Sequence, residues 1–153
     1  MEKWRDPEAN RDVWLAELAS PDDFPASVPW TCAHFAMLVL ADRVADVEPL
    51  ARAALARGIA IASAWGPAAA VMEDALGEVI TSRDAIVTSH GYESIEEALE
   101  SFLAIEPPAA RRGTCRAWCV VALGPELARA ARRALERRGF ARATITERGA
   151  TRS

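Results

Sequence analysis

The side chains with the clearest chemical potential follow short apolar runs that have the pattern of buried strands. Asp42 follows such a run at Phe35–Leu40, and His90 follows another at Ala85–Thr88. An imidazole can donate or accept a proton near neutral pH, and a carboxylate can orient the ring. We therefore expect His90 and Asp42 to be the candidate catalytic residues, with Asp42 orienting His90.

Further polar and small residues lie where these and two other apolar runs end. In an open parallel sheet, ligands bind outside the carboxyl ends of the strands, so side chains at these ends are candidates for a ligand site. Helix N-termini at the same ends would favour an anion. The predicted ligand-binding residues are Trp65, Gly66, Thr88, Ser89, Tyr92, Glu93 and Gly124.

A structural interpretation of the same residues stays open. Trp65 would pack over the sheet, Ser94 and Glu97 would cap a helix, and His90 would hydrogen-bond a neighbouring loop. The strings GxGxxG, GxxxxGK[ST] and GxSxG do not occur, which disfavours dinucleotide, P-loop and nucleophile-elbow chemistry. We expect a binding or accessory protein rather than an enzyme, with a small-molecule or anion-binding enzyme around His90 as the alternative.

Three cysteines and one histidine have spacings that would allow a zinc site. Cys32 and His34 are two residues apart, and Cys115 and Cys119 are four apart, so each pair would point to one face of a strand. Side by side, the two segments would supply a Cys3His ligand set. In the alternative, which needs no cofactor, the cysteines are small core residues.

Tryptophans near the start of the chain are candidate contacts for a partner. Exposed tryptophans are common interface anchors, so Trp4, Trp14 and Trp30 predict binding to another protein or to a second copy of the chain. A cluster of arginines near the end would form either a basic stripe for an acidic partner or a solvated helix face. These arginines are Arg129, Arg132, Arg133, Arg137 and Arg138.

Composition limits the class of protein. The 153 residues are enough for one domain, and a net charge of −4 disfavours nonspecific nucleic-acid binding. The polar stretch Met1–Asn10 has no apolar leader, and no apolar run is long enough to cross a membrane. Three cysteines do not form a disulfide framework, so we expect a cytoplasmic location.

Hydrophobic periodicity predicts alternating strands and helices after a distinct N-terminal segment. We expect residues 1–30 to form an arm or cap that contains a short helix at Asp12–Leu18, residues 31–148 a single α/β domain, and residues 149–153 a polar tail. The predicted strands are Phe35–Leu40, Ile59–Ala64, Ala85–Thr88, Cys115–Leu123 and an edge strand Ala143–Glu147. The predicted helices are Val44–Arg57, Ala68–Val79, Ile95–Ile105 and Leu127–Arg138.

This alternation predicts a three-layer, doubly wound fold of the Rossmann-like or flavodoxin-like kind, with a mainly parallel sheet of four to five strands. The stretch from Phe35 to Gly124 also resembles an uncharacterised family of small bacterial α/β proteins. The resemblance rests on Ala64-Trp65-Gly66, on Val87-Thr88-Ser89-His90 and on the helix-opening segment from Glu93 to Leu99 with Phe102. It implies the fold and a bacterial origin, and no activity.

Overall fold

The computed structural model describes residues 1–143 of the chain. Within these residues, seven strands form one sheet, and four α-helices with two short 3-10 helices connect them. The strands are β1 (Glu2–Arg5), β2 (Asp12–Leu18), β3 (His34–Leu40), β4 (Ile59–Trp65), β5 (Ile86–His90), β6 (Cys115–Leu123) and β7 (Ala141–Arg142). The helices are η1 (Pro21–Asp23), α1 (Glu48–Ala56), α2 (Ala69–Val79), α3 (Ile95–Ala104), η2 (Ala109–Arg111) and α4 (Pro125–Arg137).

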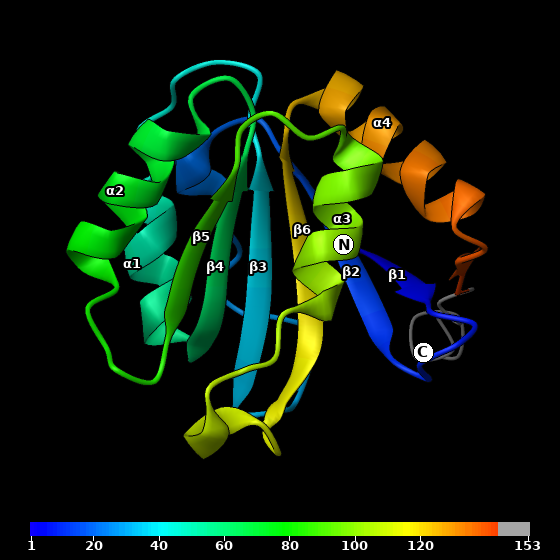
Figure 1. The fold of residues 1–153 in the computed structure, drawn as a ribbon, viewed down its shortest axis with the longest axis horizontal. Helices are drawn as coiled ribbons and strands as arrows, with labels where there is room; N and C mark the ends of the chain where they lie inside the picture. Colours follow the sequence, from blue (N-terminus) through cyan, green and yellow to red (C-terminus); the bar gives the residue numbers. More distant parts are fainter. Residues whose placement is uncertain (144–153) are drawn as a thin grey trace, which may run out of the picture.

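The strand order across the sheet is β5-β4-β3-β6-β2-β1-β7. The strands from β5 to β2 pair in parallel, whereas β1 runs antiparallel to both of its neighbours. The carboxyl ends of the parallel strands therefore meet at one rim, which is uppermost in Figure 1. This arrangement confirms the predicted doubly wound, mainly parallel α/β fold, although the described part of the chain has seven strands where four to five were expected.

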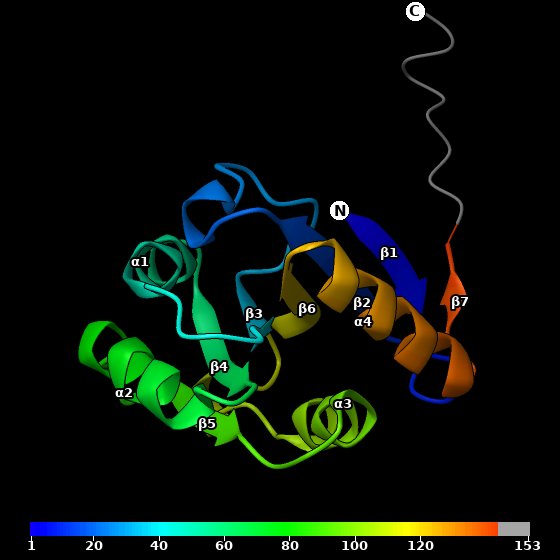
Figure 2. The ribbon, with the colours of Figure 1, turned by 90° about the horizontal axis from the view of Figure 1, so that it is seen from above.

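Helices cover both faces of the sheet and give the three layers (Figure 2). Alternate residues of β3 face opposite layers, as strand geometry requires. Met37 packs in a core with Leu50 of α1 and Met72 of α2, whereas Leu38 packs in a second core with Phe102 of α3 and the buried face of α4. Burial on both faces explains why β3 is apolar along nearly its whole length.

The N-terminal segment is part of the sheet, so its prediction as an arm with a helix was wrong. Asp12–Leu18 is strand β2, which pairs in parallel with β6 from Asp12 opposite Ala117 to Leu18 opposite Leu123. The buried run from Val13 to Ala16 has no polar face, as a strand covered on both sides requires. The spacing of Trp14, Leu15 and Leu18 also fits a helix, because a short apolar run is compatible with both the helical and the strand periodicity.

Element boundaries depart from the predictions mainly where a proline or a cap decides them. Helix α1 begins at Glu48 rather than Val44, because Pro49 fits only the first turn of a helix. Helix α3 begins after Ser94, whose hydroxyl accepts the Glu97 N–H at 3.1 Å, which confirms the predicted capping box. Most of the predicted edge strand Ala143–Glu147 lies outside the described residues. No helix in residues 1–143 is long and apolar enough to cross a bilayer.

Candidate functional site

The chain reverses its winding direction between β3 and β6. From β3 it passes through β4 to β5 at one edge of the sheet, and it then returns through α3 to β6 on the other side of β3. Such a topological switch point separates the loops that follow the two strands and leaves a crevice between them. The neighbouring strand β2 ends beside the end of β6, at the same crevice.

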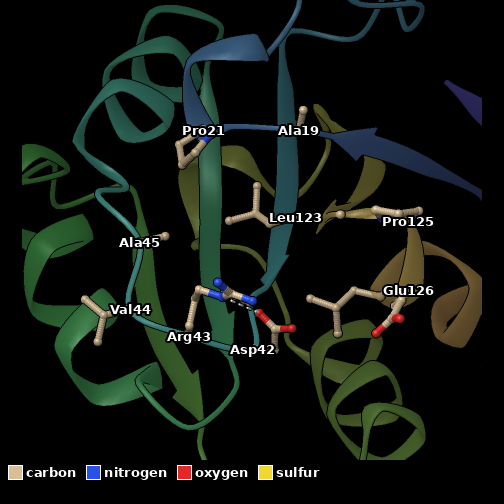
Figure 3. A pocket seen from close by; sticks show the side chains of 12 residues that line it. Ala19, Pro21, Asp42, Arg43, Val44, Ala45, Leu123, Pro125 and Glu126 are labelled. Carbon is tan, nitrogen blue, oxygen red and sulfur yellow. Dashed lines mark hydrogen bonds and ion pairs between the residues drawn. The ribbon is translucent and has the colours of Figure 1, made fainter.

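A cavity of about 530 Å³, the switch-point hollow, occupies this crevice (Figure 3). Residues after β2, after β3 and at the start of α4 surround it. They are Ala19, Pro21, Ala41, Asp42, Arg43, Val44, Ala45, Leu123, Gly124, Pro125, Glu126 and Leu127. The structure thus brings together Asp42 and Gly124, which the sequence predicted separately. Ala19 and Pro21 were not predicted to line a site, because the spacing of the preceding residues favours a helix.

Close backbone contacts hold the rim around this hollow. The Ala41 N–H, after β3, donates to the Trp65 carbonyl at 3.1 Å, and the Gly124 N–H, after β6, donates to the Leu18 carbonyl at 2.9 Å. Gly66 has a φ of +132°, and a Cβ atom there would lie 1.8 Å from the Ala41 carbonyl oxygen. Only glycine therefore allows the chain after β4 to pass so close to the end of β3.

Two carboxylates and one guanidinium supply the charge of the switch-point hollow. Asp42 Oδ1 lies 3.4 Å from Nε of Arg43, and both side chains are exposed to solvent. Glu126 lies in the first turn of α4, where a negative charge favours the helix dipole. Because the first bond of α4 runs from the Ala128 N–H to the Gly124 carbonyl, the N–H groups of Glu126 and Leu127 precede the hydrogen-bonded part of the helix.

A second cavity, of about 660 Å³, lies at the ends of β4 and β5. This His90 hollow is lined by Pro67, Ala69, Ala70, Ser89, His90, Gly91, Tyr92 and Glu93. His90 Nδ1 lies 3.4 Å from Glu93 Oε2, and its Nε2 is buried without a hydrogen-bond partner among the described residues. Glu93, rather than Asp42, is therefore the carboxylate beside His90. Asp42 follows β3, which β4 separates from β5.

Three of the predicted ligand-binding residues line neither hollow and have structural contacts instead. The Trp65 indole N–H donates to the Glu93 carbonyl at 2.8 Å, and the hydroxyls of Thr88 and Ser63 hydrogen-bond at 2.6 Å. Gly66 provides the close approach to Ala41 described above. The contact of Trp65 agrees with its structural interpretation, and Thr88, for which no such interpretation was made, has a structural contact as well.

The tryptophans proposed as partner contacts are not exposed anchors. Trp4 is 2% exposed and Trp14 is 9% exposed. Trp30 is half-buried, with its ring centroid 4.9 Å from that of Phe35 and 6.3 Å from that of Trp14. Their prediction as exposed anchors was wrong, because the N-terminal strands belong to the sheet and carry two of the three rings into the core.

The cysteines and His34 do not assemble a zinc site. His34 pairs with Cys115 across β3 and β6, and its Nδ1 lies 2.6 Å from the Thr114 hydroxyl. Cys119 lies in the core beneath α1 and α2, whereas Cys115 packs in the opposite core. Burial raises the pKa of the Cys119 thiol to about 12. Burial, and to a smaller extent the charge of the nearby Cys32, raises the pKa of the Cys115 thiol to about 11. Within residues 1–143, no three His, Cys, Asp or Glu side chains converge on a common point suited to a metal ion.

Three of the five arginines near the end of the chain pair with neighbouring elements, whereas Arg129 and Arg133 are exposed to solvent. Arg132 pairs with Glu2 of β1 at 2.6 Å, and Arg137 and Arg138 pair with glutamates of α3. Hydrogen bonds from Arg132 hold the pKa of the Glu2 carboxyl below its ordinary value, against the effect of partial burial. The side chains of Arg132, Arg137 and Arg138 thus connect α4 to both β1 and α3.

No protein-family model, curated protein or solved structure matches this chain.

Proposed function

We propose that the protein binds a small, partly apolar ligand in the switch-point hollow. The observation that carries this proposal is a cavity of about 530 Å³ at the crevice between β3 and β6, where open α/β sheets bind their ligands. Its volume lies in the range of small-molecule sites, and most of its lining is apolar with a few polar groups, as such sites require.

The polar groups define what this ligand must offer. The Asp42 and Glu126 carboxylates accept hydrogen bonds and the Arg43 guanidinium donates them, so we infer that the ligand carries a donor such as an amine or hydroxyl, together with an acceptor. Alanine, proline, valine and leucine side chains would cover its apolar part. None of the twelve lining residues is a histidine, serine, threonine, cysteine or lysine, so the Asp42 and Glu126 carboxylates are the nucleophilic side chains of the hollow.

A cavity-filling substitution tests this proposal. Ala45→Trp places a large ring at the edge of the hollow, and Ala56→Trp adds the same ring at an exposed position at the far end of α1. In a thermal-shift screen of small amines, polyols and amino acids, a ligand of the hollow should stabilise the wild type. At a ligand concentration of 100 times its Kd, the free energy of unfolding should rise by about 2.7 kcal/mol. Ala56→Trp should respond in the same way, whereas Ala45→Trp should lose the response.

The charge of the site provides an independent check. Asp42→Asn should weaken binding of the ligand found in that screen about tenfold and leave the unfolding temperature of the free protein unchanged, because Asp42 is exposed. Isothermal titration measures the affinity. Equal affinity for the wild type, Asp42→Asn and Ala45→Trp would contradict a site in the switch-point hollow.

Proton transfer at the His90 hollow is a second candidate function. His90 lines this hollow beside the Glu93 carboxylate, and a histidine in such a pair can exchange a proton with a bound ligand. This candidate predicts that some ligands stabilise the wild type and Ala45→Trp but do not stabilise His90→Gln. If His90→Gln changes the response to no ligand, the His90 hollow takes no part in binding.

A further inference from the structure

Strand β5 leaves one edge of the sheet open. It is the terminal strand and pairs only with β4, so its outward-facing N–H and C=O groups have no strand partner within residues 1–143. Its residues from Ile86 to Ser89 are half-buried, whereas β4 is fully buried from Ile59 to Ala64. Figure 2 shows β5 between α2 and α3, with its outer side uncovered. An edge of this kind can accept a further strand from another polypeptide.

The two helices beside this edge carry only negative charge. Helix α2 contains Glu73, Asp74 and Glu78, helix α3 contains three glutamates, and neither contains a lysine or arginine. Two of the α3 glutamates pair with arginines of α4. The three α2 carboxylates pair with no basic side chain of residues 1–143, so no ion pair offsets their charge.

A shallow, open hollow lies between α2 and β5 on this side. It has a volume of about 530 Å³ and is lined by Glu73, Asp74, Gly77, Glu78 and Val87. A Cβ atom built at Gly77 would have no neighbour within 4 Å, so the helix surface leaves room there. Val87 packs with the core beneath α1 and α2, whereas Ile86 packs with the opposite core. A strand added to β5 would therefore direct every second side chain over the three carboxylates.

We propose that the β5 edge binds an extended segment of a partner protein that carries arginine or lysine at alternate positions. Backbone hydrogen bonds to β5 would supply the pairing, and the carboxylates of α2 would select the basic side chains. A second copy of the same edge is a poor partner, because it would bring the acidic helices of both copies together. This surface is separate from the switch-point hollow, which opens at the ends of β2, β3 and β6.

Synthetic peptides test the proposal on the full chain. The probe is a fluorescent nine-residue peptide with arginine alternating with valine and threonine, and its binding is measured by anisotropy at low salt. A second peptide has the same sequence with N-methyl groups on alternate backbone nitrogens, which removes hydrogen-bond donors without changing charge. We expect the first peptide to bind, the methylated peptide to bind at least tenfold more weakly, and amide exchange in β5 to slow when the first peptide binds.

Matched charge variants separate the edge from the net charge of the protein. Glu73→Lys with Glu78→Lys should weaken peptide binding at least tenfold. Glu8→Lys with Glu136→Lys makes the same change in net charge at exposed positions on β1–β2 and α4, and should alter the affinity less than twofold. Equal losses in both variants, equal binding of the methylated peptide, or no binding at millimolar peptide would each overturn the proposal. Circular dichroism confirms that the variants are folded.

Discussion

The two rims of the parallel sheet are built differently. At the rim where the strands begin, side chains bond to the backbone of distant elements: Arg111 donates to the Ile59 carbonyl at 2.6 Å, and Arg57 to the Ala26 carbonyl at 2.8 Å. At the rim where the strands end, the charged Asp42 and Arg43 are exposed and pair with each other. The charged side chains of the first rim thus secure the fold, whereas those of the second, where backbone bonds and the Trp65 indole hold the loops, stay available for a ligand.

The largest difference should appear between Gly58, at the strand-start rim, and Gly124, which lines the switch-point hollow; Gly66, after β4, is as tightly enclosed as Gly58. Gly58, where the strands begin, has a φ of +89°, and a Cβ atom there would lie 2.2 Å from the Ala33 carbonyl oxygen. Gly124, where they end, has a φ of +111° but nothing within 4 Å of such an atom. We expect Gly58→Ala to lower the free energy of unfolding by more than about 3 kcal/mol, and Gly124→Ala by about 1–2 kcal/mol. Urea denaturation measures both, and equal losses would contradict the comparison.

Removing Arg111 should have the next largest effect. Arg111→Gln deletes a charged donor to the partly enclosed Ile59 carbonyl, which we expect to cost about 2 kcal/mol. The matched control is Arg112→Gln, because Arg112 pairs with Glu106 at 3.5 Å and both side chains are exposed. This control should change stability by less than about 0.5 kcal/mol. Similar values for the two variants would show that the bond to Ile59 does not secure this rim.

His34 should give the same rim a modest pH dependence. Partial burial, with the positive charge of Arg111, lowers the pKa of His34 below its ordinary value, despite an opposing effect of Asp84. The unfolded chain therefore binds the proton more readily. The stability that neutral His34 contributes is fully present above the ordinary pKa of about 6.5, and it is lost as the pH falls through the lower folded value.

NMR titration of the imidazole checks this prediction directly. The wild type should show a His34 pKa below the ordinary value, and Arg111→Gln should raise it, because the substitution removes a nearby positive charge. The free energy of unfolding should fall less between about pH 7 and pH 5 in His34→Gln than in the wild type. If Arg111→Gln leaves the His34 pKa unchanged, Arg111 does not influence the protonation of His34, and the prediction is wrong.

The central fold could be predicted from the sequence because local signals agree there. Phe35–Leu40 is an apolar run too short for a helix, and Ser94 with Glu97 marks the start of α3 through side-chain bonds that involve only nearby residues. The N-terminal strands could not be predicted in this way. Whether Asp12–Leu18 becomes a strand or a helix is decided by its pairing with β6, about a hundred residues later, and no local pattern reports that pairing.

The candidate site was only partly predictable for the same reason. The rule that ligands bind at strand ends identified Asp42 and Gly124, which do line one hollow, and Ser89, His90, Tyr92 and Glu93, which line another. It could not tell that the two groups are separate, because this depends on strand order. Strand β4 separates β3 from β5, so Asp42 and His90 follow strands roughly 10 Å apart.

The place of β2 beside β6 has a consequence for how the chain folds during synthesis. Residues 12–18 leave the ribosome first, but their partner strand spans residues 115–123. At about 5–20 residues per second, the apolar run from Val13 to Ala16 waits several seconds before it can be buried. Folding should therefore be slow for a protein of this size, and a chaperone that shields short apolar segments should raise the yield of native protein.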